Sequence, residues 1–113
     1  NTTGSQSNAF GYNALTNSNG SYNNAFGQQA LEDNTTGVHN AAFGHDCMRE
    51  NTTASYNTAF GSASLATVTT SSANTGIGYQ ALTANMMFGA KTLLLSSQTM
   101  TFYVTNQRLA ATN

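Results

Sequence analysis

The chain has 113 residues, a formal net charge of −1 and only 6% charged side chains. Its three cations, Arg49, Lys91 and Arg108, are scattered, whereas nucleic acids and anionic membrane surfaces are bound by clustered cations, so the composition argues against both partners. A single cysteine excludes an internal disulfide, and no apolar run approaches the length of a membrane span.

A short tripeptide, Ala-Phe-Gly, recurs along the first half of the chain. Its copies begin at Ala9, Ala25, Ala42 and Ala59. The full unit has seventeen residues, as in 23–39, 40–56 and 57–73, and a fifth copy opens at residue 74 with isoleucine in place of phenylalanine. Self-similarity at a fixed short period is typical of coiled, stacked structures. The spacing therefore predicts a repeating β-structure.

The first copy, which starts at Ser7, is one residue shorter than the others. We place the missing residue between Leu15 and Asn17, in the stretch that reads Asn-Thr-Thr-Gly elsewhere. Loops tolerate a change in length better than strands do. The Asn-Thr-Thr-Gly stretch is therefore predicted to be a loop.

Each unit carries two apolar anchors. The first is the aromatic residue of the tripeptide or its replacement, and the second is a large apolar residue five positions later, Leu15, Leu31, Met48, Leu65 or Leu82. One stripe of anchors can fill the interior of the coil while the other faces neighbouring subunits. The glycine after each aromatic can interrupt the inward–outward alternation of side chains along a strand. The sequence therefore leaves open which of the two stripes fills the coil and which faces neighbouring subunits.

The composition is otherwise highly polar, since Asn, Thr, Ser and Gly make up 54 of the 113 residues. Such polarity usually indicates disorder, but stacked coils join a few anchors per coil into one continuous core. Stacked Asn and Thr side chains are expected to form ladders. We expect Asn at the coil corners to adopt left-handed backbone geometry and Thr to bond to the local backbone.

The pattern Asn-x-Ala-Phe-Gly-x-x-Ala-Leu-x-x-Asn-Thr-Thr-Gly resembles the repeats of phage tail-fibre and related surface-fibre proteins. Its first half is similar to trimeric autotransporter adhesin heads, whose repeat is shorter. The resemblance covers roughly residues 1–93. It implies a homotrimeric parallel β-roll, extracellular or on a virion, that is used in attachment to a host-surface glycan or protein receptor.

The C-terminal segment departs from the pattern. Residues 87–93 resemble a truncated sixth copy, and residues 93–95 form an apolar run. Residues 99–105 combine partial polar/apolar alternation with β-forming side chains, which predicts a capping or transition strand. We therefore divide the chain into a β-solenoid at 1–93 and a C-terminal β segment at 94–113. Without an initiator methionine or a leader, the sequence is interpreted as a fragment or a trimmed mature chain.

Potential metal ligands gather at the end of the second copy and in the third copy. They are His39, His45, Asp46, Cys47 and Glu50. In other copies Tyr occupies the position of His39, and Ala or Ser occupies that of Cys47, so we interpret the histidines as exposed and the cysteine as a small packing residue. The spacing matches no standard zinc pattern. No metal or other cofactor is predicted.

The carboxylates of the chain also lie close together in sequence. Glu32 or Asp33 could approach Glu50 one coil away, as the two carboxylates of a glycosidase do. Charged residues at loop positions are more often solvated, and no catalytic residue is assigned. The prediction is that the protein is not an enzyme.

Other surface features leave alternatives open. Asn-x-Ser/Thr sequons occur at Asn1, Asn19, Asn34 and Asn51, and we interpret them as structural. Threonine ranks at 35–36, 52–53 and 69–70 suggest ice binding. Exposed tyrosines at 12, 22, 56 and 79 suggest carbohydrate stacking. The favoured function is a structural or adhesive segment of a trimeric extracellular or virion fibre.

Overall fold

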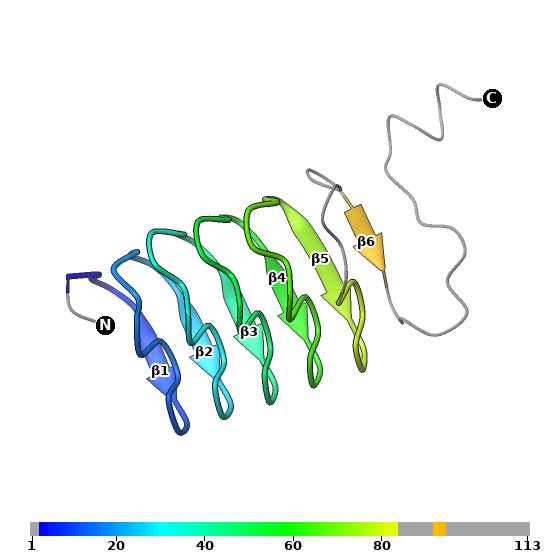
Figure 1. Ribbon diagram of the computed structural model, residues 1–113, viewed down its shortest axis with the longest axis horizontal. Helices are drawn as coiled ribbons and strands as arrows, with labels where there is room; N and C mark the ends of the chain where they lie inside the picture. The colour runs from blue at the N-terminus through cyan, green and yellow to red at the C-terminus, as the bar shows by residue number, and fades with distance from the viewer. Residues whose placement is uncertain (1–2, 84–91, 95–113) are drawn as a thin grey trace.

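The computed structural model describes residues 3–83 and the strand 92–94 (Figure 1). These residues contain no helix. Six short strands follow one another along the rod: β1 Asn8–Phe10, β2 Asn24–Phe26, β3 Ala41–Phe43, β4 Thr58–Phe60, β5 Asn74–Ile77 and β6 Thr92–Leu94. Each strand pairs in parallel with the next, in the order β1-β2-β3-β4-β5-β6. The predicted class, an all-β parallel β-solenoid, is confirmed.

The strands pair in the register that the repeat predicts. Ala25 lies opposite Ala42, and Ala42 lies opposite Ala59. After β5 the spacing changes, because Asn74 pairs with Thr92, eighteen residues later. The sheet thus continues through residue 94, across the predicted boundary at 93. Residues 87–91 of the predicted truncated copy and the predicted strand at 99–105 lie outside the described residues, whereas residues 92 and 93 of that copy belong to β6.

The core lies inside the coils, between the strands and the segment that returns to the next strand. The middle residue of each strand from β2 to β4 is an alanine that points inward and is fully buried. From the return segment, the second anchors complete the core, and all of them are at most 5% exposed: Leu15, Leu31, Met48, Leu65 and Leu82. The second stripe of anchors therefore fills the coil, and the aromatic stripe does not.

Glycine ends each of the strands β1 to β4 because the chain turns there with a backbone that L-residues avoid. Gly27 and Gly44 have φ values of 140° and 141°. A Cβ on Gly44 would lie 2.6 Å from the carbonyl oxygen of Gly61 in the next coil. Both the dihedral angle and the close approach of the next coil therefore require glycine.

The return segment contains left-handed residues that the sequence did not predict. The second anchors all have φ between 52° and 55°, although leucine and methionine rarely adopt this conformation. Asn34 and Asn51, which we expected to be left-handed, are not among the residues with positive φ. That expectation was wrong. The anchors accept the strained backbone because it places their side chains in the core.

Buried asparagines form a ladder along the solenoid axis instead. Asn40 donates its backbone N–H and its Nδ2 to Oδ1 of Asn23, at 2.9 and 3.2 Å. The backbone N–H groups of Asn57 and Asn74 repeat this contact one and two coils later. All four side chains are at most 1% exposed. Asparagine is thus kept at this position for its buried hydrogen bonds, and the predicted Asn ladder is confirmed.

At the coil corners, the hydroxyls of Thr35 and Thr52 bond to the neighbouring coil rather than to the local backbone. Thr35 donates Oγ1 to the carbonyl of Thr52 at 2.8 Å, and Thr52 donates to the carbonyl of Thr69 at 3.1 Å. The predicted local contact is therefore wrong for Thr35 and Thr52, whereas Thr83 does donate Oγ1 to the local carbonyl of Gln80 at 2.7 Å. The hydroxyls of Thr35 and Thr52 each join two successive coils because the backbone carbonyl of the equivalent residue in the next coil lies within hydrogen-bond distance.

The shorter first coil lacks a residue at a different place from the one predicted. Asn19 donates its backbone N–H to the carbonyl of Thr35, its equivalent in the second coil. The next residue, Gly20, lies against Gly37. Thr36 is therefore the residue without a counterpart, and the deletion falls between Asn19 and Gly20. The Asn-Thr-Thr-Gly corner absorbs it, while the interval between Leu15 and Asn17 keeps full register.

Candidate functional site

A column of large apolar side chains runs along the outside of the sheet. This Phe column consists of Phe10, Phe26, Phe43, Phe60 and Ile77. Alternation along each strand turns these side chains outward because the preceding alanine or glycine points into the coil. Their rings stack between coils, with centroids 4.9 Å apart for Phe26 and Phe43 and 4.5 Å apart for Phe43 and Phe60.

Four members of the Phe column are exposed to solvent, and Phe43 is half-buried. Phe10 is 73% exposed, Phe60 is 50% exposed and Ile77 is 43% exposed. Two residues before each of them, a second outward column carries Asn8, Asn24, Ala41, Thr58 and Thr75. We call these two columns together the outer face. Counting back two residues from each aromatic would have identified the second column in the sequence.

A second aromatic column, the Tyr–His column, stands at the corner that precedes the strands. His39 is sandwiched between Tyr22 and Tyr56, with ring centroids 4.7 and 5.1 Å apart and planes within 5° of parallel. All three side chains are exposed, as the sequence predicts for His39. Because the stacking covers both faces of the middle ring, a ligand can reach only its edge.

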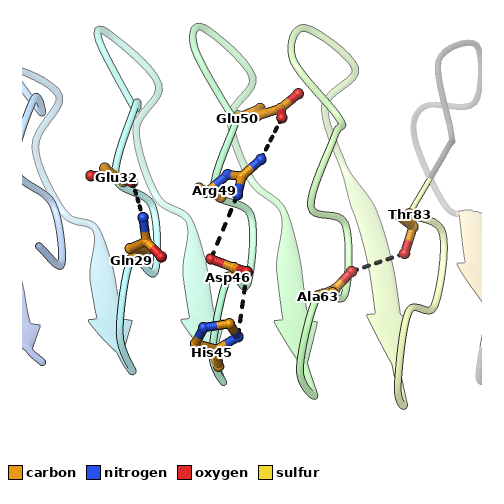
Figure 2. Close-up of polar contacts among 8 residues, drawn as sticks. All are labelled: Gln29, Glu32, His45, Asp46, Arg49, Glu50, Ala63 and Thr83. Carbon is orange, nitrogen blue, oxygen red and sulfur yellow. Dashed lines mark hydrogen bonds and ion pairs between the residues drawn. The ribbon is translucent and has the colours of Figure 1, made fainter. Parts of the chain in front are cut away.

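The charged side chains of the third coil form a chain of contacts across the return segment (Figure 2). His45 Nδ1 lies 3.4 Å from Asp46 Oδ2, and Arg49 Nη1 lies 3.9 Å from Asp46 Oδ1. Arg49 also donates Nη2 to Glu50 at 2.8 Å, and this bond raises the pKa of the guanidinium group. The positive charge of Arg49 is therefore paired with the carboxylates of Asp46 and Glu50 within the same coil.

The candidate metal ligands are not brought together. His39 is in the Tyr–His column, and Cys47 is fully buried in the core, away from the exposed His45. Within residues 3–83 and 92–94, no three His, Cys, Asp or Glu side chains are placed to hold a metal ion. The arrangement offers no preformed metal centre in this part of the protein.

The carboxylates considered as a glycosidase pair, none of which is assigned as catalytic, have hydrogen-bond partners on the surface. Glu32 accepts hydrogen bonds from Asn13 Nδ2 at 2.9 Å and from Gln29 Nε2 at 3.0 Å (Figure 2 shows the second). Asp33 accepts one from Asn17 Nδ2 at 3.0 Å, and Glu50 accepts one from Arg49. These contacts tie neighbouring parts of the surface together, and nothing in them activates a water or a sugar oxygen.

Cys47 is a small packing residue, as predicted. Its side chain is 0% exposed, and its Sγ lies 3.4 Å from the carbonyl oxygen of Ala59 in the next coil. Burial raises the pKa of the thiol to about 12. The thiolate, which is the reactive form, is therefore absent at neutral pH.

Two of the four sequons are closed to glycosylation in the folded protein. Asn34 and Asn51 are both 0% exposed. Their Nδ2 groups each donate two hydrogen bonds inside the coil, at 2.7 to 3.1 Å. Asn51 Oδ1 is also buried, and it has no hydrogen-bond partner, because Val68 occupies the equivalent position in the next coil. Asn19 is exposed, and Asn1 lies outside the described residues.

Among the described residues there is no helix that could cross a membrane. Comparison of the chain with protein-family models, with curated proteins and with solved structures found no match.

Proposed function

We propose that this chain is a structural and adhesive segment of a trimeric fibre, located outside the cell or on a virion surface. The observation that carries the proposal is the Phe column, which continues over five coils of an otherwise polar solenoid. Large contiguous apolar patches on a soluble protein usually mark an interaction site. A rod that carries such a column along its length is suited to lateral association.

The interior of the solenoid supports the same proposal. Its largest buried side chains are only leucine, methionine, valine and asparagine, and the strands contribute alanine. A core this thin makes a small domain marginal on its own. Burial of the Phe column between copies would supply the missing apolar contact.

The alternatives have less support. Ice binding would use regular threonine ranks, but the hydroxyls of Thr35 and Thr52 already donate to the backbone of the next coil. Carbohydrate stacking would use open ring faces, but stacking in the Tyr–His column covers both faces of His39 and one face each of Tyr22 and Tyr56. Tyr12 and Tyr79 are 72% and 67% exposed, but they are four coils apart.

Mass in solution tests the proposal. Light scattering on the purified 113-residue chain is expected to give three times the chain mass of 11.8 kDa. Circular dichroism on the same sample establishes that the chain is folded. A folded chain that stays at 11.8 kDa over the whole accessible concentration range would refute the trimer and the lateral role of the Phe column.

A further inference from the structure

The outer face is the strongest candidate for an unassigned interaction surface. We infer that it is the contact between copies, with three rods parallel, their equivalent coils at one level, and the Phe columns gathered around the shared axis. This inference rests on the proposed trimeric fibre, which already uses the Phe column, and adds to it the second column of the outer face, the parallel orientation and the common level of the copies.

The apolar area of the outer face fits this role. A phenylalanine side chain presents about 150–250 Å² when fully open. With the exposed fractions of the Phe column between 39% and 73% at four of its five members, roughly 400 Å² of apolar surface is in contact with water. A standard interface takes about 800 Å² from each partner. The Phe column therefore supplies about half of such an area, and the neighbouring column of small polar side chains supplies more.

The charge distribution separates this face from the rest of the surface. Neither column of the outer face contains a charged residue. Every charged side chain of residues 3–83 lies in the return segment of the second or third coil: Glu32, Asp33, Asp46, Arg49 and Glu50. A second copy can therefore approach the outer face without bringing like charges together or burying an unpaired charge.

The other aromatic surface is less suited to self-association. The Tyr–His column is three residues long, carries an ionisable ring at its centre, and is already stacked within its own chain. The Phe column instead extends over all five coils and consists only of apolar side chains.

Parallel copies at one level follow from the repeat itself. Around an axis that runs along the rod, each coil meets its own equivalents, so every added coil extends the contact by the same step. Such cyclic symmetry buries the Phe column from β1 to β5 in every copy. An antiparallel pair would instead place Phe10 against Ile77 and would have a two-fold axis only at the central coil.

A matched pair of variants tests the face. Phe60→Asp puts a charge in the Phe column, and Tyr56→Asp puts the same charge at the end of the Tyr–His column; these rings are 50% and 62% exposed. The masses of wild type and of both variants are measured by light scattering over a range of concentrations. Wild type is expected to dissociate into monomers only on dilution, whereas Phe60→Asp is expected to remain a folded monomer at concentrations at least tenfold higher than those at which wild type dissociates. Tyr56→Asp is expected to remain trimeric.

Cross-linking tests the orientation. Single cysteines replace Asn24, Ala41 or Thr75 on the outer face in a Cys47→Ala background, and a short bis-maleimide is added. Parallel copies at one level are expected to cross-link through all three positions. Cross-linking at Ala41→Cys alone would show an antiparallel pair and overturn the orientation. Thr53→Cys, at the exposed corner, is the negative control.

The outcomes separate the inference from the function on which it rests. If wild type is trimeric and Phe60→Asp is also trimeric, the assignment of the face is wrong, while the trimeric fibre stands. If wild type is monomeric and folded at every concentration, the proposed function fails, and the inference fails with it.

Discussion

The buried asparagine ladder is predicted to contribute more to stability than any exposed polar contact, and Asn40→Ala tests this. Asn40 Nδ2 donates to Asn23 Oδ1 at 3.2 Å and to the carbonyl of Ala54 at 2.9 Å. Its Oδ1 accepts the backbone N–H of Asn57 at 2.9 Å. The alanine variant removes all three bonds and leaves the buried Asn57 N–H without this acceptor.

The magnitude follows from these contacts. An internal hydrogen bond contributes about 1 kcal/mol net, and a buried polar group left unpaired costs a further ~1–3 kcal/mol. Three lost bonds and one unpaired group therefore lower the expected free energy of unfolding of Asn40→Ala by about 4–6 kcal/mol, a large part of the ~5–15 kcal/mol of a typical domain. The matched control is Asn24→Ala, since Asn24 is only partly buried and accepts one bond, from Asn8 Nδ2 at 2.7 Å. Its expected cost is about 1 kcal/mol.

Urea unfolding followed by circular dichroism measures both variants against wild type. The reasoning fails if Asn40→Ala and Asn24→Ala differ by less than about 1 kcal/mol, which is the value of a single hydrogen bond. Such a result would mean that the ladder contributes no more than a surface contact. The stability of the solenoid would then have to come from its apolar anchors and backbone bonds.

Three further predictions concern single positions. Gly44→Ala is expected to prevent folding or to lower the midpoint of unfolding sharply, because the new Cβ meets the Gly61 carbonyl at 2.6 Å; a thermal melt equal to that of wild type would contradict this. Cys47, whose pKa rises from 9.0 to about 12 on burial, should make stability fall as the pH rises from about 9 toward 12, since only the unfolded thiol ionises there; Cys47→Ala should lose this dependence in pH-dependent denaturation. Val68→Asn should unfold at a higher urea concentration than Val68→Ala, because only asparagine can donate to the unpaired Asn51 Oδ1; equal midpoints would show that this oxygen needs no donor.

The fold could be predicted from the repeat because residues at equivalent positions of successive coils make the same contacts and are therefore of the same type. Ala25 pairs with Ala42 because both fill the same narrow interior, and the seventeen-residue spacing alone indicates that pairing. The role of Cys47 could be predicted in the same way, from the small residues at equivalent positions. Periodicity reveals which residues are equivalent.

Periodicity does not reveal the direction in which equivalent residues point. The assignment of Leu31 to the core and Phe26 to the outside depends on the turn at Gly27 and on the left-handed φ of 53° at Leu31. Residue propensities do not predict the positive φ of Leu31, because burial of its side chain overrides the preference of leucine for negative φ. The deletion opposite Thr36 was also misplaced, since only the pairing between coils defines it.

The uniform spacing of the strands has a consequence for how the protein folds. Parallel strands usually need long connections, and sheets built from distant segments fold slowly. Here each strand from β1 to β4 pairs with the next one only 16 or 17 residues along the chain. Every coil therefore closes a loop of nearly the same length, at nearly the same entropic cost. Each ordered coil then offers its strand for pairing to the coils on either side, so folding can begin at any pair of coils and spread in both directions.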